Sequence, residues 1–138
     1  MREKLEKSCD AIEECYEFML AYAAQGLAGD QGSHSGSQLR GYLTRAACAI
    51  ADLADTFTAL VKQENLQPAD KYHTFISVLD RDASEALAAI ELVLAQPSLS
   101  SQLIDNLNAS IHVRALLTDL FLIDEIAKPS PPKPVAAP

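Results

Sequence analysis

Apolar residues recur at steps of three and four along most of the chain, and short polar breaks divide them into four stretches. This spacing places the apolar side chains on one face of an α-helix. It predicts helices over residues 3–27, 38–65 and 69–95, and a fourth that begins after Ser98 or Ser100 and runs to Ala127. Four helices of similar length with short connections are typical of a four-helix bundle.

The breaks carry residues that end and begin helices. The segment 29–37, GDQGSHSGS, is rich in glycine and serine, and its last residue, Ser37, is a good N-cap for the second helix. Pro68 stands at the first turn of the third helix, where a missing N–H does no harm. The connections are too short for a full-length crossover. We therefore expect an all-α fold, an antiparallel up-down-up-down four-helix bundle over residues 1–128, of a handedness that the sequence does not fix.

The last ten residues, 129–138, have a different composition from the rest of the chain. They are proline-rich, and proline does not continue a helix. The sequence predicts a flexible C-terminal tail here.

A weak internal repeat links the second and fourth predicted helices. A shift of 64 residues places Ser37, Gln38 and Leu39 on Ser101, Gln102 and Leu103, and it also pairs Phe57 with Phe121. A duplicated helical hairpin would explain these matches. Two unrelated amphipathic helices with the same cap would explain them equally well, so both interpretations stay open.

Composition and charge exclude several classes of function. The net charge is −8 and no basic stripe is present, which argues against binding to nucleic acid or to an anionic membrane surface. The three cysteines, Cys9, Cys15 and Cys48, are odd in number and form no Cys-x-x-Cys pair, as in proteins of a reducing compartment. The N-terminus has no apolar signal core, and no apolar run is long enough to span a bilayer. We expect a cytoplasmic protein.

The last third of the fourth predicted helix is apolar on nearly every side. A helix in a lone bundle needs only one apolar stripe, so the surplus face calls for a cover. The cover can be a second copy, a protein partner or the C-terminal tail folded back, and a homodimer is the first choice because two-fold dimers are the commonest oligomers. The expected contact residues are Leu116, Leu120, Phe121 and Ile123. The alternative is a wide core face with ordinary scattered apolar surface.

Metal-binding patterns are sparse. A di-iron bundle needs Glu-x-x-His motifs, and this chain has none. The nearest candidates are Cys9, three residues after Glu6, and His73, three residues after Asp70, which the repeat would place at one end of the bundle. These acids also suit the first turn of a helix without any metal. We expect no metal and no cofactor.

A second constellation could form a polar layer in the middle of the bundle. Arg114 interrupts the apolar stripe of the fourth predicted helix. Counted from the helix ends, it lies level with Asp52 and Asp82, with Glu13 and Glu17 within a turn. A buried arginine needs a carboxylate, so the first interpretation is a salt bridge that fixes the register of the helices. A small anion or carboxylate site is the alternative.

No arrangement of residues predicts catalysis. The histidine at His112 lacks the neighbours that phosphorelay helices carry, and no nucleophile has a recognisable base. The sequence therefore predicts a non-enzymatic interaction protein that uses the apolar face of its last helix. The alternative is a bundle that binds a metal or a small ligand.

Overall fold

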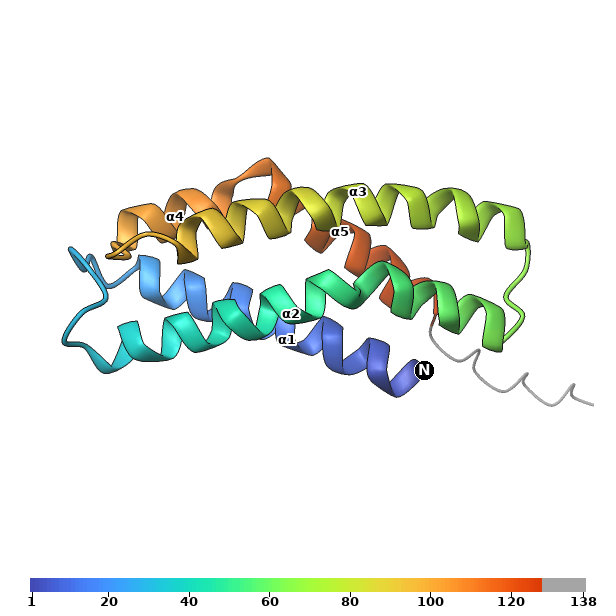
Figure 1. Cartoon of the computed structure of the whole chain (residues 1–138), viewed down its shortest axis with the longest axis horizontal. Coiled ribbons are helices and arrows are strands. Elements are labelled where there is room, and N and C mark those ends of the chain that lie inside the picture. Colours follow the sequence, from blue (N-terminus) through green and yellow to red (C-terminus); the bar gives the residue numbers. More distant parts are fainter. Residues whose placement is uncertain (128–138) are drawn as a thin grey trace, which may run out of the picture.

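The computed structural model describes residues 1–127, and over this range the chain is all-helical with no β-strand. Three long helices are followed by two shorter ones (Figure 1). Their bounds are α1 Arg2–Ala23, α2 His34–Gln63, α3 Ala69–Leu94, α4 Ser101–Ala109 and α5 Ile111–Ile126. The predicted tail, 129–138, lies outside the described residues.

The first three helices follow the predicted spans, with differences at two ends. The first helix ends at Ala23, four residues early, and the chain then reaches Gly26 in the left-handed region at φ 65°. The second begins earlier than predicted, because Ser33 rather than Ser37 is the N-cap. The Oγ of Ser33 accepts a hydrogen bond from the Gly36 N–H at 2.9 Å. Ser33 can do this because its backbone is extended at the point where the helix starts.

The fourth predicted helix is broken in two, so the expectation of a continuous helix to Ala127 was wrong. Ser110 has a ψ of 145°, which ends α4 and starts α5 in a new direction. Its Oγ accepts a hydrogen bond from the Val113 N–H at 3.3 Å. The helix start before the break is capped in the same way by Ser100, whose Oγ accepts from the Leu103 N–H at 3.0 Å.

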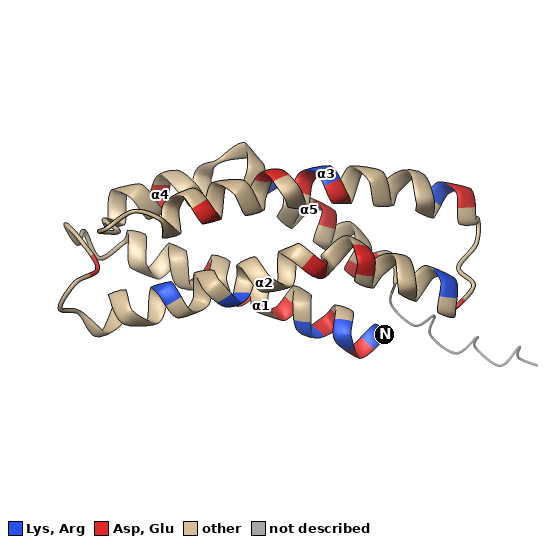
Figure 2. Cartoon of the chain, in the orientation of Figure 1, with Lys and Arg blue, Asp and Glu red and all other residues tan. Residues whose placement is uncertain are grey.

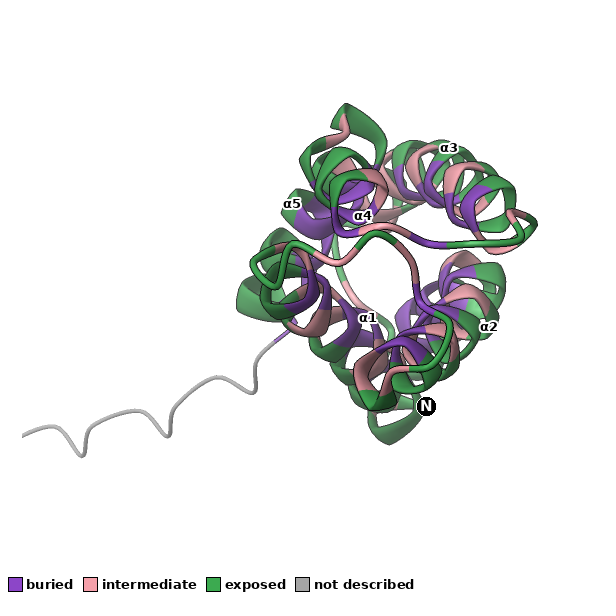
Figure 3. Cartoon of the chain, turned by 90° about the vertical axis from the view of Figure 1, so that its left-hand side faces the viewer, coloured by how far each residue is buried: buried purple, intermediate pink, exposed green. Residues whose placement is uncertain are grey.

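The helices enclose one hydrophobic core. Viewed from the end, the buried residues of each helix face a shared interior (Figure 3). Helix α1 packs on α2 and α4, α2 packs on α3, and α3 also packs on α4 and α5. Removal of these apolar side chains from water is the main term that stabilises the packing. Tyr22, Phe57 and Met19 are the largest side chains that are fully buried.

A buried polar network joins the loops at one end of the molecule. Asp30 accepts hydrogen bonds from Arg40 Nε at 2.6 Å and from the Leu99 N–H at 2.7 Å. The Tyr22 hydroxyl donates to the Leu99 carbonyl at 2.6 Å, and Ser101 Oγ donates to the Tyr22 carbonyl at 2.7 Å. These bonds connect α1, α2 and the segment between α3 and α4, and so fix where α4 begins.

At the opposite end, Arg2 connects three helix termini. Its guanidinium donates to the carbonyl oxygen of Ala127, at the end of α5, and pairs with Glu64, at the end of α2, at 2.6 Å. Figure 1 shows that α5 starts beside α3 and descends toward this end of α1. The course of α5 is therefore fixed by its cap at Ser110 and by Arg2.

Candidate functional site

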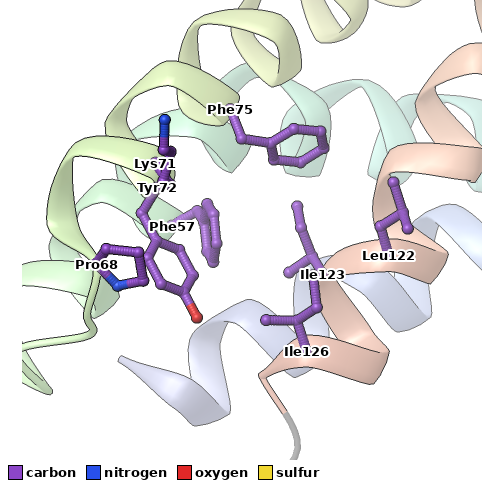
Figure 4. Close-up of a pocket in the computed structure, with 8 residues that line it drawn as sticks. All are labelled: Phe57, Pro68, Lys71, Tyr72, Phe75, Leu122, Ile123 and Ile126. Atoms are coloured by element: carbon purple, nitrogen blue, oxygen red, sulfur yellow. The ribbon is translucent and has the colours of Figure 1, made fainter.

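An apolar groove opens between α3 and α5, near the end of α2 (Figure 4). It has a volume of about 330 Å³. Its lining residues come from three helices and from the turn before α3: Phe57, Pro68, Lys71, Tyr72, Phe75, Leu122, Ile123 and Ile126. We call this set the α3–α5 groove.

The groove exists because α5 departs from α3 instead of lying along it. Tyr72 and Phe75 lie on one face of α3 and remain half-buried, whereas Phe57 is buried beneath them on α2. The Phe57 and Tyr72 rings are tilted against each other, with centroids 6.2 Å apart. In Figure 4 the aromatic rings form one wall and the α5 isoleucines the other. A continuous fourth helix could have covered this part of α3, so the break at Ser110 accounts for the opening.

Three large apolar side chains near the end of α5 are exposed. Phe121 is 59% exposed, Leu122 49% and Ile126 61%. Leu122 and Ile126 also line the groove itself. We call these three residues the α5 ridge. An exposed apolar surface of this kind, beside a concave apolar site, is typical of a binding surface.

The structure changes the residues that were expected to make partner contacts. Leu116, Leu120 and Ile123 are buried in the core, so they do not provide an exposed face. Of the four expected residues, only Phe121 is exposed. The sequence pattern indicated that this helix has more apolar surface than one core face needs. The break at Ser110 determines which side of it faces the core. Leu122 was missed although it lies in the same apolar stretch, and Ile126 was missed because it follows that stretch after Asp124 and Glu125.

The expected mid-bundle polar layer does not form. Arg114 is exposed, as are Asp52 and Glu17, while Glu13 and Asp82 are half-buried. The expected register was counted along a continuous helix, and the extended residue Ser110 interrupts that count. Arg114 therefore lies on the outer face of α5.

The buried charge in this region is Asp119, which sequence reasoning passed over. It is only 6% exposed, and its Oδ2 has no hydrogen-bond partner among the described residues. Burial and the neighbouring carboxyl of Asp82 raise its pKa to about 7. Its position midway between Leu116 and Ile123, both in the buried stripe, is the signal that could have revealed it.

Cys9 and His73, the two candidate metal ligands, lie in different environments. Cys9 is buried, and burial together with nearby carboxylates raises the pKa of its thiol to about 12, which disfavours the thiolate that binds metals. His73 is exposed on α3. Within residues 1–127, no three His, Cys, Asp or Glu side chains come together as a metal site would require. His112 is also exposed, and its Nδ1 lies 3.6 Å from Glu85.

Most charged residues are exposed, and the basic residues are few and stand among acidic ones along the helices (Figure 2). Within the described part of the chain, no helix is both long and apolar enough to cross a membrane. The groove and ridge are therefore the surface that calls for an explanation. Comparison of the chain with known protein families, curated proteins and solved structures gave no match.

Proposed function

We propose that this chain is a non-enzymatic interaction protein and that it binds a second copy of itself through the α3–α5 groove and the α5 ridge. The observation that carries the proposal is that Leu122 and Ile126, two of the three exposed ridge side chains, line an apolar groove. Burial of such side chains is worth roughly 25 cal/mol for each Å² removed from water. The exposed ridge therefore favours a state in which it is covered.

A two-fold arrangement suits this surface. In a two-fold dimer the same patch serves on both copies, so a ridge on one copy can enter the groove of the other. Groove and ridge share Leu122 and Ile126, which places both halves of such a contact within one patch. Lys71 at the groove could meet the exposed Asp124 of the other copy, which would favour one orientation.

The test is light scattering coupled to size exclusion, over a range of concentrations, on the wild type and on two ridge variants. We expect the wild type to be a dimer at micromolar concentration. Phe121→Asp and Ile126→Asp place a charge in the contact and should raise the dimer Kd at least tenfold, or about 1.4 kcal/mol. Both residues are exposed in the monomer, so helicity and thermal stability should stay close to those of the wild type.

Leu92→Asp is the matched control. Leu92 is 67% exposed and lies in the last turn of α3, away from the groove at the start of that helix. It should leave the Kd unchanged. A wild type that stays monomeric at all concentrations contradicts the proposal, and so does a Leu92→Asp variant that weakens association as much as Phe121→Asp. Substitutions at Leu120 or Ile123 would test folding instead, because these residues are in the core.

The proposal includes a finer description of the architecture. We propose that the helices form an antiparallel up-down-up-down four-helix bundle in which α4 and α5 together take the fourth position. The contacts of α1 with α2, of α2 with α3, and of α3 and α1 with the α4–α5 pair support this order. A reducing, cytoplasmic setting also fits, because Cys48 is an exposed free thiol.

A small apolar ligand is the second candidate for the groove. A volume of about 330 Å³ falls within the range of small-molecule sites, and the lining is aromatic and aliphatic. The test is titration with an apolar fluorescent probe. Saturable 1:1 binding that is lost in Phe75→Asp and retained in Leu92→Asp would support this function. Probe binding that Phe75→Asp leaves unchanged would rule it out.

A further inference from the structure

A pair of carboxyl groups lies between α3 and α5, next to the groove. Asp119 of α5 is 94% buried, and the neighbouring Asp82 of α3 is half-buried. The two carboxyl groups are neighbours across the packed interface of α3 and α5. The buried Oδ2 of Asp119 has no hydrogen-bond partner among the described residues, and a proton on either carboxyl would supply the donor that it lacks.

The other charged groups near α5 are engaged elsewhere or exposed. From α3, Glu85 faces His112 at 3.6 Å. From α1, Glu13 interacts with Asp124, and Arg2 donates to the Ala127 carbonyl. Asp105 of α4 is exposed, as are Arg114 and Asp124 on α5 itself.

The charged residues in the middle of α2 are exposed, and the buried polar residues of α4 are neutral. In the middle of α2, Asp52 and Asp55 are exposed. Helix α4 contributes Asn108, which is buried but neutral. Asp82 is the charged group that acts on Asp119.

We propose that Asp82 and Asp119 form a proton-dependent latch that holds α5 against α3 when one proton is shared between them and weakens that packing when the proton is lost. In the protonated pair, one carboxyl donates an O–H···O hydrogen bond to the other and the net charge is −1. Loss of the proton to solvent removes the hydrogen bond and leaves two negative charges side by side in an apolar interface. No other bond forms or breaks.

The latch lies on the same two helices that form the walls of the groove. Asp119 lies one turn before Leu122 and Ile123 on α5, and Asp82 lies two turns after Phe75 on α3. Any separation of α5 from α3 therefore widens the groove between these walls. This regulatory consequence depends on the proposed binding function, whereas the latch itself does not.

The direction of the pH effect follows from the shift in protonation. The raised pKa of Asp119, about 7, applies to the closed state. Once α5 has moved away, this carboxyl returns toward its ordinary value of about 4. The closed state then binds more protons than the open state between these values. Opening should thus become more favourable as the pH rises toward 7 and should level off above it.

The test is amide hydrogen exchange on the full chain from pH 5 to pH 8, with rates corrected for intrinsic pH dependence. In the wild type, the opening equilibrium of α5 should rise by up to about tenfold per pH unit below pH 7. Asp119→Asn keeps the shape of the side chain and supplies an N–H donor to Asp82, so its exchange should be independent of pH. Asp82→Asn supplies the donor from the other side and should have the same effect.

Asp124→Asn is the matched control, since Asp124 is an exposed carboxylate on the same helix. It should keep the pH dependence of the wild type. Exchange of α5 that does not change with pH, or pH dependence that survives in both Asp119→Asn and Asp82→Asn, would overturn the latch.

Light scattering at the same pH values separates the latch from the proposed function. If the groove binds a second copy, the wild-type association constant should rise with pH relative to that of Asp119→Asn. A pH-dependent α5 in a protein that stays monomeric would support the latch and contradict self-association. A dimer whose association constant follows the same pH course in wild type and Asp119→Asn would overturn regulation of the groove by the latch.

Discussion

At the scale of single residues, the close approach of the 24–33 loop to α2 depends on one glycine. A Cβ on Gly36 would lie 2.6 Å from the carbonyl carbon of Asp30 and closer still to its oxygen. No real side chain tolerates such a contact with backbone. Gly36 therefore allows Asp30 to reach Arg40 and Leu99 in the polar network.

We predict that Gly36→Ala destabilises the protein by about 1–3 kcal/mol, because the loop must move away from α2. Gly41→Ala is the control in the same helix. Nothing lies within 4 Å of a Cβ at Gly41, so alanine there should stabilise α2 by about 0.5–1 kcal/mol. Urea unfolding measures both changes, and an equal effect of the two substitutions would contradict the close approach.

The spacing of apolar residues predicted the buried apolar face of the helices well, but it did not predict which polar residue is buried in that face. Leu39, Leu43 and Ile50 are buried as their spacing indicated. The spacing of apolar residues does not single out Asp119, because a carboxylate in an apolar stretch can equally well face solvent. Whether such a residue is buried depends on the rotation of α5, which the stripe alone does not determine.

At the scale of elements, Ser110 is the residue that makes two helices out of one. The segment around it, Asn108-Ala109-Ser110-Ile111-His112, contains no glycine or proline, the usual signals of a helix end. The break becomes visible only in the structure, where Ser110 has an extended backbone and a capping hydrogen bond. The groove could not be predicted for the same reason, since it follows from the new direction of α5.

We expect Ser110→Ala to destabilise the protein by about 1 kcal/mol, because the Val113 N–H loses its side-chain cap. Ser77→Ala is the matched control, as Ser77 is an exposed serine inside α3. That change should be neutral or stabilise by up to about 0.5 kcal/mol. Thermal unfolding followed by circular dichroism compares the two, and a Ser110→Ala variant as stable as Ser77→Ala would argue against the cap.

At the scale of the whole molecule, the polar network at one end and the Asp82–Asp119 pair between α3 and α5 should respond to pH in opposite ways. The Arg40 hydrogen bond, with help from the Leu99 N–H, holds the pKa of Asp30 below its usual range. An acid with a lowered pKa stabilises the fold above its ordinary value, and this contribution is lost as the pH falls through the folded-state value. The raised pKa of Asp119 has the opposite sign, so its contribution is lost as the pH rises toward 7.

Asp30→Asn should therefore lower the stability by about 2 kcal/mol at pH 7, since it removes a charged hydrogen-bond acceptor. The loss should shrink as the pH falls through the lowered pKa of Asp30, because the wild type then also gives up the charge. Asp10→Asn, at an exposed carboxylate of α1, should change little at either pH. Urea unfolding at several pH values provides the comparison, and an Asp30→Asn penalty that does not depend on pH would contradict the role of the carboxylate.

We infer that a second copy of the chain covers the α3–α5 groove and the α5 ridge. The most direct test follows the methyl resonances of leucine and isoleucine by NMR during dilution. We predict that the Leu122 and Ile126 methyl signals shift as the dimer dissociates, while those of Leu92 and Ile111, also exposed, do not. Signals that stay constant at all four residues, or shifts confined to Leu92 and Ile111, would contradict the account.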